Sequence, residues 1–426
     1  MPVNSRGKRK HRVVVVGAGF GGLACARRLA QAGVRVTVVD RRREHEFQPL
    51  LYQVATGALN PRAIRSRIRS LLPKQVRFVR DTITSIDADA QRVVLSEEAL
   101  SYDTLVVAPG AQMDMPDAFP EALAMKTTAD ALELRQHLFT HFAMAFDERN
   151  TAAAQVLVVG GGPTGVELAG EIRRLAEEEL AHSSLAPRVI LVEQSDRLLP
   201  GFMRRSSVAA ENMLERLGVE LRLESTVERR SLGDYTIRGT RGSVDVEAKT
   251  LVWAAGVRPS SLVSTLGETD ETGRVFVDSQ CRLKNDPDIY VIGDAARFRG
   301  DDETLPWVAA VAIQQGVYVG RSIVQRIRRE EPRDFRYFDR GRLAHVGGRA
   351  AVGEVFGVPL RGLAPFLLAE AVHLAYLPRI ENRLIAARDF IAAQLGRRPH
   401  PSTVSKRSSV VFDAPSTRSA PQPTFH

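Results

Sequence analysis

Cysteines, aromatic residues and long apolar runs are scarce in this chain of 426 residues, and each scarcity excludes a class of protein. Only two cysteines are present, Cys25 and Cys281, so the chain is not a disulfide scaffold and has no CxxC pair for dithiol redox chemistry or for a cysteine-rich metal site. No stretch reaches the ~20 apolar residues of a membrane-spanning helix. The nearest, Gly362–Leu377, is interrupted by Glu370 and His373.

Positive charge, in contrast, is abundant. Lys and Arg together number 59 against 50 Asp and Glu, which gives a net charge of +9, and only seven of the basic residues are lysine. Such a surface can meet nucleic acid, anionic lipid or an acidic cofactor, and composition alone does not choose among them. Residues 1–10 form a basic N-terminus and residues 397–426 are rich in Ser, Thr and Pro, so we expect both ends to be disordered.

The apolar run from Val13 to Ala26 follows the basic N-terminus, which is the outline of a signal peptide. The same residues contain a glycine motif that cleavage would destroy, so we interpret them as a first β-strand and helix. From there the pattern alternates between strand and helix. A strand–helix–strand unit is expected at Val13–Val16, Leu23–Ala32 and Arg35–Asp40, and again at Gln155–Val159, Gly165–Glu178 and Arg188–Glu193. Two copies of one unit predict an α/β fold with two Rossmann-like, doubly wound domains.

The first copy carries a glycine motif between its strand and its helix. Gly17 permits a tight turn, Gly19 lets the backbone approach a pyrophosphate, and Gly22 lets the helix pack closely on the strand. Asp40 ends the second strand, where it can accept hydrogen bonds from a ribose diol. In this context the motif is strong evidence for a dinucleotide site. Its candidate contacts are Gly17, Gly19, Phe20, Gly21, Gly22 and Asp40.

The second copy repeats this arrangement, with candidate contacts Gly160, Gly162, Gly165 and Glu193. A carboxylate at the end of the second strand repels a 2′-phosphate, so NADH is favoured over NADPH. Arg197 is the nearest cation along the chain. A protein with two such sites most simply binds a flavin in one and a nicotinamide in the other, with hydride passing between the two cofactors.

Three further segments resemble parts of two-dinucleotide flavoproteins. Tyr102–Ala111 and Asp288–Ala296 resemble the two chain returns at the FAD site, and Leu251–Pro259 resembles the strand that leads out of the NAD domain. The resemblance implies FAD in the first site, with Gly110 and Asp294 among its contacts, and NADH in the second, near Gly256. We expect a helix directly after the acidic turn of Asp294, where this residue could instead be a helix cap.

A narrower resemblance covers roughly residues 11 to 395 and points to the type II NADH dehydrogenases, which are single-subunit NADH:quinone oxidoreductases. Three segments resemble parts of the family's sites: Phe47–Gly57 its flavin-lining segment, Pro163–Gly170 its NADH site and Ala309–Gly316 the start of its quinone-site helix. Its C-terminal region is matched by Phe335–Tyr337, Asp339–Gly341, His373 and Asn382–Leu384. Two positions depart from the family. Pro109 stands where a threonine is usual, which puts flavin tuning in doubt, and Ala310 stands where a glutamine is common, which puts the acceptor in doubt.

The resemblance implies an FAD-dependent enzyme that passes hydride from NADH to FAD and two electrons on to a membrane quinone, without proton pumping. It implies a discontinuous FAD domain (11–112 and 265–340), an NAD(H) domain (113–264) and a C-terminal helical, membrane-associating region (341–396). Gln53, Thr56 and Ala312 become further cofactor contacts. Gln314 and Gln315 would donate hydrogen bonds to quinone oxygens, although helix-surface glutamines bonded to water are the alternative.

Glu167 is the third candidate catalytic residue. It could hold the nicotinamide carboxamide or assist a proton, or it could simply complement the dipole of its helix. No metal site is expected, because His345 and His373 are isolated in the sequence, and Cys25 is expected to be a small core residue.

Contact with the bilayer is expected at the C-terminal region, because a quinone is lipid-soluble. Phe366–Leu377 is apolar nearly all round, and Leu384, Ile391 and Leu395 form one stripe of the following helix. This suits a helical hairpin lying in an anionic membrane surface on the cytoplasmic face of the cell membrane, with the protein otherwise cytoplasmic. A homodimer interface is the alternative, and the family's usual tryptophans are missing here.

Two other functions remain open at this point. The chain could reduce a soluble electron carrier of the ferredoxin or rubredoxin type, or a pathway-specific small molecule. It could also be a flavin-based sensor that uses its charge on nucleic acid, but aromatic residues make up only 6% and no motif interleaves them with basic residues, so no nucleic-acid partner is expected.

Overall fold

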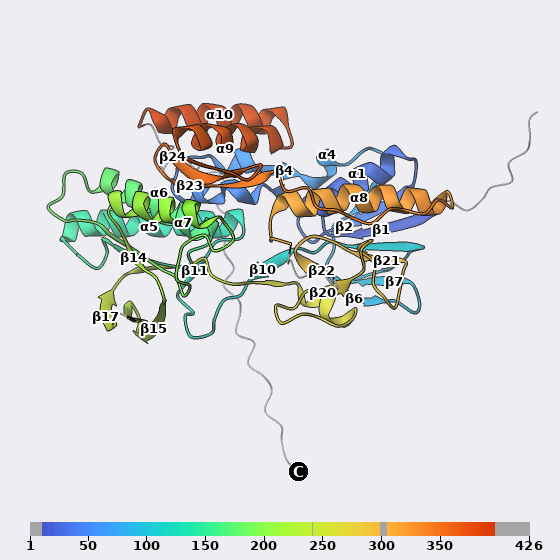
Figure 1. The fold of residues 1–426 in the computed structure, drawn as a ribbon, viewed down its shortest axis with the longest axis horizontal. Helices are drawn as coiled ribbons and strands as arrows, with labels where there is room; N and C mark the ends of the chain where they lie inside the picture. The colour runs from blue at the N-terminus through green and yellow to red at the C-terminus, as the bar shows by residue number, and fades with distance from the viewer. Residues whose placement is uncertain (1–10, 241, 299–304, 397–426) are drawn as a thin grey trace, which may run out of the picture.

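Two five-stranded parallel sheets lie along the long axis of the molecule (Figure 1). The computed structural model describes residues 11–240, 242–298 and 305–396, so the expectations for both chain ends lie outside the described residues. The first sheet has the order β21-β9-β1-β2-β5, with β1 (Arg12–Val16), β2 (Arg35–Val39), β5 (Arg77–Val79), β9 (Thr104–Val107) and β21 (Ile289–Val291). The second has the order β11-β18-β12-β13-β14, with β11 (Leu123–Ala124), β12 (Gln155–Val159), β13 (Arg188–Val192), β14 (Val219–Arg222) and β18 (Thr250–Trp253).

The two strand–helix–strand units were predicted within one or two residues at nearly every boundary. β1 pairs with β2 so that Val16 lies opposite Val39, and β12 pairs with β13 so that Val159 lies opposite Val192. The helices between them are α1 (Phe20–Gln31) and α6 (Pro163–Glu179). Both begin earlier than expected because the glycine turn runs directly into the helix. The α/β fold with two Rossmann-like units is confirmed.

Helix α8 (Ala309–Ile327) lies alongside α1 (Figure 1). Glycines make this close approach possible, since a Cβ at Gly316 would overlap the carbonyl oxygen of Gly21. The sequence placed a helix directly after Asp294, and this was wrong. A 3₁₀ turn, η3 (Gly293–Ala295), leads into β22 (Ala296–Phe298), because those residues pair with β20 (Val275–Val277).

Each parallel sheet is accompanied by a small antiparallel one, and a two-stranded pair lies where the chain crosses between domains. The antiparallel sheets are β6 (Ile83–Asp87), β7 (Arg92–Leu95) and β8 (Ala99–Ser101), and β15 (Ser225–Ser231), β16 (Asp234–Gly239) and β17 (Gly242–Glu247); the crossing pair is β10 (Ala111–Met113) and β19 (Val257–Pro259). The other elements are β3 (Glu44–Glu46), η1 (Gln48–Leu50), α2 (Leu51–Ala55), α3 (Pro61–Ile64), β4 (Arg65–Arg67), α4 (Ile68–Leu71), α5 (Thr128–Glu148), α7 (Arg204–Arg216) and η2 (Ser261–Thr265).

The C-terminal region combines a three-stranded antiparallel sheet with a helical hairpin. The sheet consists of β23 (Gly341–Gly347), β24 (Ala350–Val355) and β25 (Val358–Gly362), and the helices are α9 (Leu363–Tyr376) and α10 (Ile380–Gln394), which cover it at the top of Figure 1. The hairpin was expected, whereas the sheet was not, because its strands are short and separated by glycine turns. Within the described residues, no helix is both long and apolar enough to cross a membrane.

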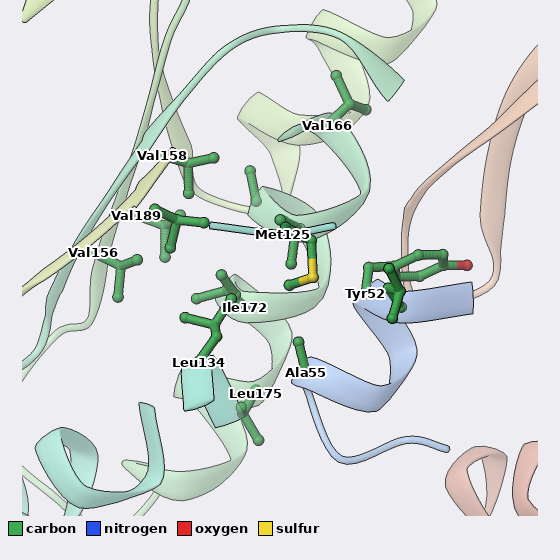
Figure 2. Packing of buried hydrophobic residues seen from close by; sticks show 14 of the residues in the cluster. Tyr52, Ala55, Met125, Leu134, Val156, Val158, Val166, Ile172, Leu175 and Val189 are labelled. Atoms are coloured by element: carbon green, nitrogen blue, oxygen red, sulfur yellow. The ribbon is translucent and has the colours of Figure 1, made fainter. Parts of the chain in front are cut away.

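The largest hydrophobic cluster joins segments that lie far apart in the sequence. Figure 2 shows Ala55 of α2 facing Met125, Leu134 of α5 and Ile172 of α6, while the Tyr52 ring points away from them toward the C-terminal region. Residues 47–64, which belong to the expected FAD domain, therefore contribute to a core that also contains the second Rossmann unit. This packing fixes the expected flavin-lining segment relative to the second dinucleotide site.

Candidate active site

The two glycine turns have the same geometry. Gly17 and Gly160 have φ angles of +91° and +111°, in the region that favours glycine. A Cβ at Gly22 would overlap the Gly17 carbonyl oxygen, and one at Gly165 would overlap that of Gly160. The first and last glycine of each motif are therefore required by the turn itself, whatever the turn binds.

The middle glycines are different, because the protein leaves space beside them. A Cβ at Gly19 or at Gly162 would meet nothing within 4 Å. Gly19 and Gly162 are the N-caps of α1 and α6, and neither helix has a side-chain cap or an acidic residue in its first turn. Within the described residues, no side chain therefore caps the N-terminal ends of α1 and α6, which is the arrangement that binds a pyrophosphate. The residues present fit FAD and NADH.

The carboxylates that follow the second strand of each unit also have matching positions in the two units. Asp40 accepts hydrogen bonds from the backbone N–H of Ala18 and of Arg42, each at 2.8 Å. Glu193 accepts them from Gly161 at 2.5 Å and from Ser195 at 2.7 Å. In both units the carboxylate thus fixes the glycine turn and lies at its edge, where its remaining lone pairs can accept from a ribose diol.

Asp294 lies at the acidic turn that the sequence assigned to FAD. Burial raises the pKa of its carboxyl, and the Lys126 ammonium opposes that rise. Burial lowers the pKa of Lys126, which the nearby Asp294 carboxylate offsets. Lys126 was not predicted from the sequence, although it is one of only seven lysines and directly precedes the helix cap Thr127. Lys126 and Asp294 thus interact electrostatically at this turn.

The three residues predicted at the start of the quinone-site helix, Ala312, Gln314 and Gln315, already contact other parts of the protein. The Gln314 amide donates to the Phe338 carbonyl and accepts from the Phe338 N–H, both at 3.0 Å. Gln315 is buried and accepts from the Gly293 N–H at 2.6 Å. Ala312 packs beside Gly293 and Gly21. Gln315 and Ala312 therefore lie at the Gly-Asp turn, whereas Gln314 is anchored to Phe338 and keeps one amide N–H for a further acceptor.

The residues expected on the flavin-lining segment are buried and paired. Gln53 donates to the Tyr52 hydroxyl at 3.0 Å and to Glu370 Oε1 at 2.8 Å. The Thr56 hydroxyl donates to the Tyr52 carbonyl at 2.9 Å. Gln53 thus ties this segment to the C-terminal region. Gly110 and Gly256, both with positive φ, flank the paired strands β10 and β19 at the crossing between the domains.

Glu167 lies between α6 and the C-terminal sheet. Its Oε1 accepts a hydrogen bond of 3.3 Å from the His345 N–H of β23. Burial raises the pKa of Glu167 to about 8; the hydrogen bond from His345 opposes the rise, and the carboxylates of Glu370 and Glu171 add to it. A carboxyl with a pKa of about 8 can hold a proton near neutral pH, which makes Glu167 a candidate proton donor.

His345 and His373 are not isolated in space, contrary to the sequence expectation. Together with Glu370 they form a cluster whose nitrogen and oxygen atoms lie within 4.8 Å of one another. Burial lowers the pKa of His345 to about 3 and that of His373 to about 4, and it raises the pKa of Glu370 to about 7. The sequence offered one indication of this cluster, because Glu370 is an ionisable residue within an otherwise apolar helix.

Two equivalent dinucleotide sites, one beside a half-buried Gly-Asp turn, define a nucleotide-dependent oxidoreductase that carries a flavin and a nicotinamide. The family model of the pyridine nucleotide-disulphide oxidoreductases matches residues 11–316. A type II NADH:quinone oxidoreductase of Mycobacterium tuberculosis is 35% identical, across 94% of this chain and 92% of that protein. Another, from Staphylococcus aureus, is 29% identical, across 83% of this chain and 92% of that protein.

The fold is also found in a solved structure. NDH2 from Plasmodium falciparum in complex with NADH superposes with a TM-score of 0.83 at 18% identity, covering 92% of this chain and 99% of that one. The chain belongs to the pyridine nucleotide-disulphide oxidoreductase family and, within it, to the type II NADH:quinone oxidoreductases.

Proposed function

We propose that this protein oxidises NADH and reduces a membrane quinone. The observation that carries the proposal is the pair of matched phosphate-binding turns in a chain whose thiols cannot relay electrons. Cys25 and Cys281 are both buried and unbridged, and burial raises the pKa of each thiol. With no reactive dithiol, the electrons leave the flavin for a diffusible acceptor directly.

Bound FAD would supply the redox chemistry, which is hydride transfer from NADH and two-electron reduction of the quinone without proton pumping. The protein chain itself holds the two cofactors in position and supplies protons. The Gly19 turn and Asp40 hold the FAD, and the Gly162 turn and Glu193 hold the NADH, with the Glu193 carboxylate disfavouring a 2′-phosphate. Glu167, whose pKa burial raises to about 8, donates a hydrogen bond or a proton on the nicotinamide side.

On the side of the flavin where the quinone is expected, we propose that Gln315 rather than Gln314 lies nearer to the flavin. Gln315 is bonded to Gly293, next to Asp294, and Ala312 lies against the same turn. Gln314 instead holds the segment around Phe338. The alternative acceptor, a soluble electron carrier, is less well supported by the named relatives.

Flavin bleaching tests the proposed function. Protein purified in detergent should be yellow, NADH should bleach it, and a short-chain ubiquinone or menaquinone should restore the colour within a turnover. NADPH should bleach it more slowly, because Glu193 repels the 2′-phosphate. Reoxidation by ferredoxin or rubredoxin, and not by any quinone, would contradict the proposal and favour the soluble carrier.

The exposed face of α9 and α10 is the surface that we propose for the membrane. Helix α10 differs from an ordinary surface helix, because it buries Asn382 and Asp389 together with two alanines while several of its large apolar residues are exposed. Asn382 bonds to the Arg62 and Arg65 carbonyls, and Asp389 accepts from the Asn60 N–H. The apolar face consists of Ile380, Leu384, Ile391 and Leu395, each 60–69% exposed, joined by Leu363, Leu367, Leu368, Val372 and Tyr376 of α9.

This apolar face supports peripheral attachment to the bilayer, at the cytoplasmic face where NADH is available. The Arg383 guanidinium donates to the Leu377 and Ala375 carbonyls, so we propose that the hydrophobic contact rather than this arginine supplies the attachment. The same face could form a homodimer, which the next experiment distinguishes.

Leu384→Glu combined with Ile391→Glu should lower the fraction of protein that floats with vesicles by about 10-fold or more, since two large apolar side chains leave the membrane surface. Leu232→Glu is the matched control, because Leu232 is 71% exposed on the turn between β15 and β16, outside the apolar face. Unchanged flotation of the double variant, with loss of a dimer in gel filtration, would assign the face to self-association instead.

A further inference from the structure

Two histidines and one glutamate form a compact cluster between the C-terminal sheet and α9. His345 comes from β23, while Glu370 and His373 are three residues apart on α9 and therefore share one face of that helix. One donor atom from each lies within 4.8 Å of the others. His345 and Glu370 are among the buried polar residues of the protein, so the cluster is not a surface patch.

The cluster has unused hydrogen-bonding capacity. His345 Nε2 is buried and has no hydrogen-bond partner within the part of the chain that the structure describes, and the same holds for His373 Nδ1. Glu370 Oε1 lies 3.6 Å from His345 Nε2, which is close but outside hydrogen-bonding distance. Leaving two buried imidazole nitrogens unpaired is unfavourable, so a ligand that satisfies them would stabilise the arrangement.

We propose that His345, Glu370 and His373 bind a divalent transition-metal ion, with Zn²⁺ as the best fit. Two imidazoles and one carboxylate are a known zinc ligand set, with metal–ligand bonds of about 2.0–2.2 Å and a fourth position for water. At such bond lengths, two ligands of a tetrahedral ion lie ~3.4 Å apart. The 3.6 Å between His345 Nε2 and Glu370 Oε1 is already close to this spacing.

The surroundings orient these ligands as the second shell of a metal site does. Gln53 donates to Glu370 Oε1 at 2.8 Å and leaves that carboxylate further lone pairs. The Tyr52 and Phe366 rings lie 5.7 and 5.1 Å from the His345 ring, and they limit how it can turn. A bound ion would therefore join β23 and α9 to the segment of Gln53. This ion-binding role goes beyond the proposed oxidoreductase activity, although the site borders it, since the His345 N–H also bonds to Glu167.

A second histidine pair has to be controlled for. His137 and His141 are adjacent on α5, with ring centroids 4.0 Å apart, and an i, i+4 pair can also chelate a metal. Each already has a partner, since His137 Nε2 pairs with the Lys249 carbonyl and His141 Nδ1 with the Thr250 hydroxyl. His137→Gln removes this pair without touching the proposed site, so it serves as the background for the test.

Zinc binding by the FAD-loaded H137Q protein tests the proposal. After chelator treatment and buffer exchange, titration with Zn²⁺ should show one equivalent bound, and Co²⁺ in its place should give visible bands at longer wavelength than the flavin absorption. H345Q and E370Q, each made in the H137Q background, should weaken binding by about 100-fold. His182→Gln, an exposed site away from the cluster, should leave it unchanged.

The flavin content and the melting temperature of each variant show whether it has folded. In the H137Q background, Zn²⁺ should raise the melting temperature, and in H345Q and E370Q it should not. Absence of a stoichiometric ion in H137Q would overturn the proposal. Retention of the ion in both folded H345Q and E370Q would overturn it equally, and neither result would bear on NADH oxidation, which bleaching of the flavin measures separately.

Discussion

Gly19→Val should give a folded but colourless protein. The new side chain meets no protein atom, because a Cβ at Gly19 has nothing within 4 Å, and the backbone angles there suit any residue. The side chain instead fills the space at the N-terminus of α1 that a pyrophosphate needs. We expect FAD affinity to fall about 100-fold or more, with loss of NADH oxidation. The measurement is the flavin-to-protein ratio after gel filtration, alongside the circular dichroism spectrum.

Gly162→Val is the matched control for the same prediction. It fills the equivalent space at α6 and should leave the protein yellow while preventing NADH from bleaching it. The two variants together separate the two sites, which no single substitution does. A Gly162→Val protein that loses its flavin while Gly19→Val keeps it would show that FAD and NADH had been assigned to the wrong turns.

Glu167→Gln should slow flavin reduction by NADH about 100-fold while FAD stays bound, because the amide keeps the acceptor for the His345 N–H but cannot give up a proton. Stopped-flow absorbance of the flavin measures this step apart from quinone reduction. Glu177→Gln, at an exposed position on the same helix, is the control and should leave the rate unchanged. An unaltered rate in Glu167→Gln would remove this residue from the chemistry.

The pH dependence of flavin reduction tests the role of Glu167 independently. Burial raises the pKa of Glu167 to about 8, so its carboxyl is protonated below that pH and loses its proton as the pH rises through it. If the protonated form is the active one, flavin reduction should fall above about pH 8 in the native protein. The Glu167→Gln protein should show no such decline. A decline of equal size in both proteins would assign it to another group.

Local features of the fold and the site were accessible from the sequence. The glycine spacing, the carboxylates at the strand ends and the apolar stripe of Leu384, Ile391 and Leu395 depend on residues that are near neighbours along one turn, strand or helix. Their geometry follows from the backbone period, and the structure has it as expected. The helix after Asp294 was misjudged because β22 forms through pairing with the distant β20, which no local pattern indicates.

What the sequence by itself determined about this protein is thus the pair of dinucleotide turns and the family to which they belong, since a Cβ at the overlapping positions of these turns would collide with the backbone. Only the tertiary structure decided which side chains meet across the fold. Gln53 bonds to Glu370 over a sequence separation of 317, and the His345 N–H bonds to Glu167 over 178. Such pairs depend on how the C-terminal region packs onto the Rossmann core, and apolar periodicity specifies only that each face is buried, not which polar groups are buried together.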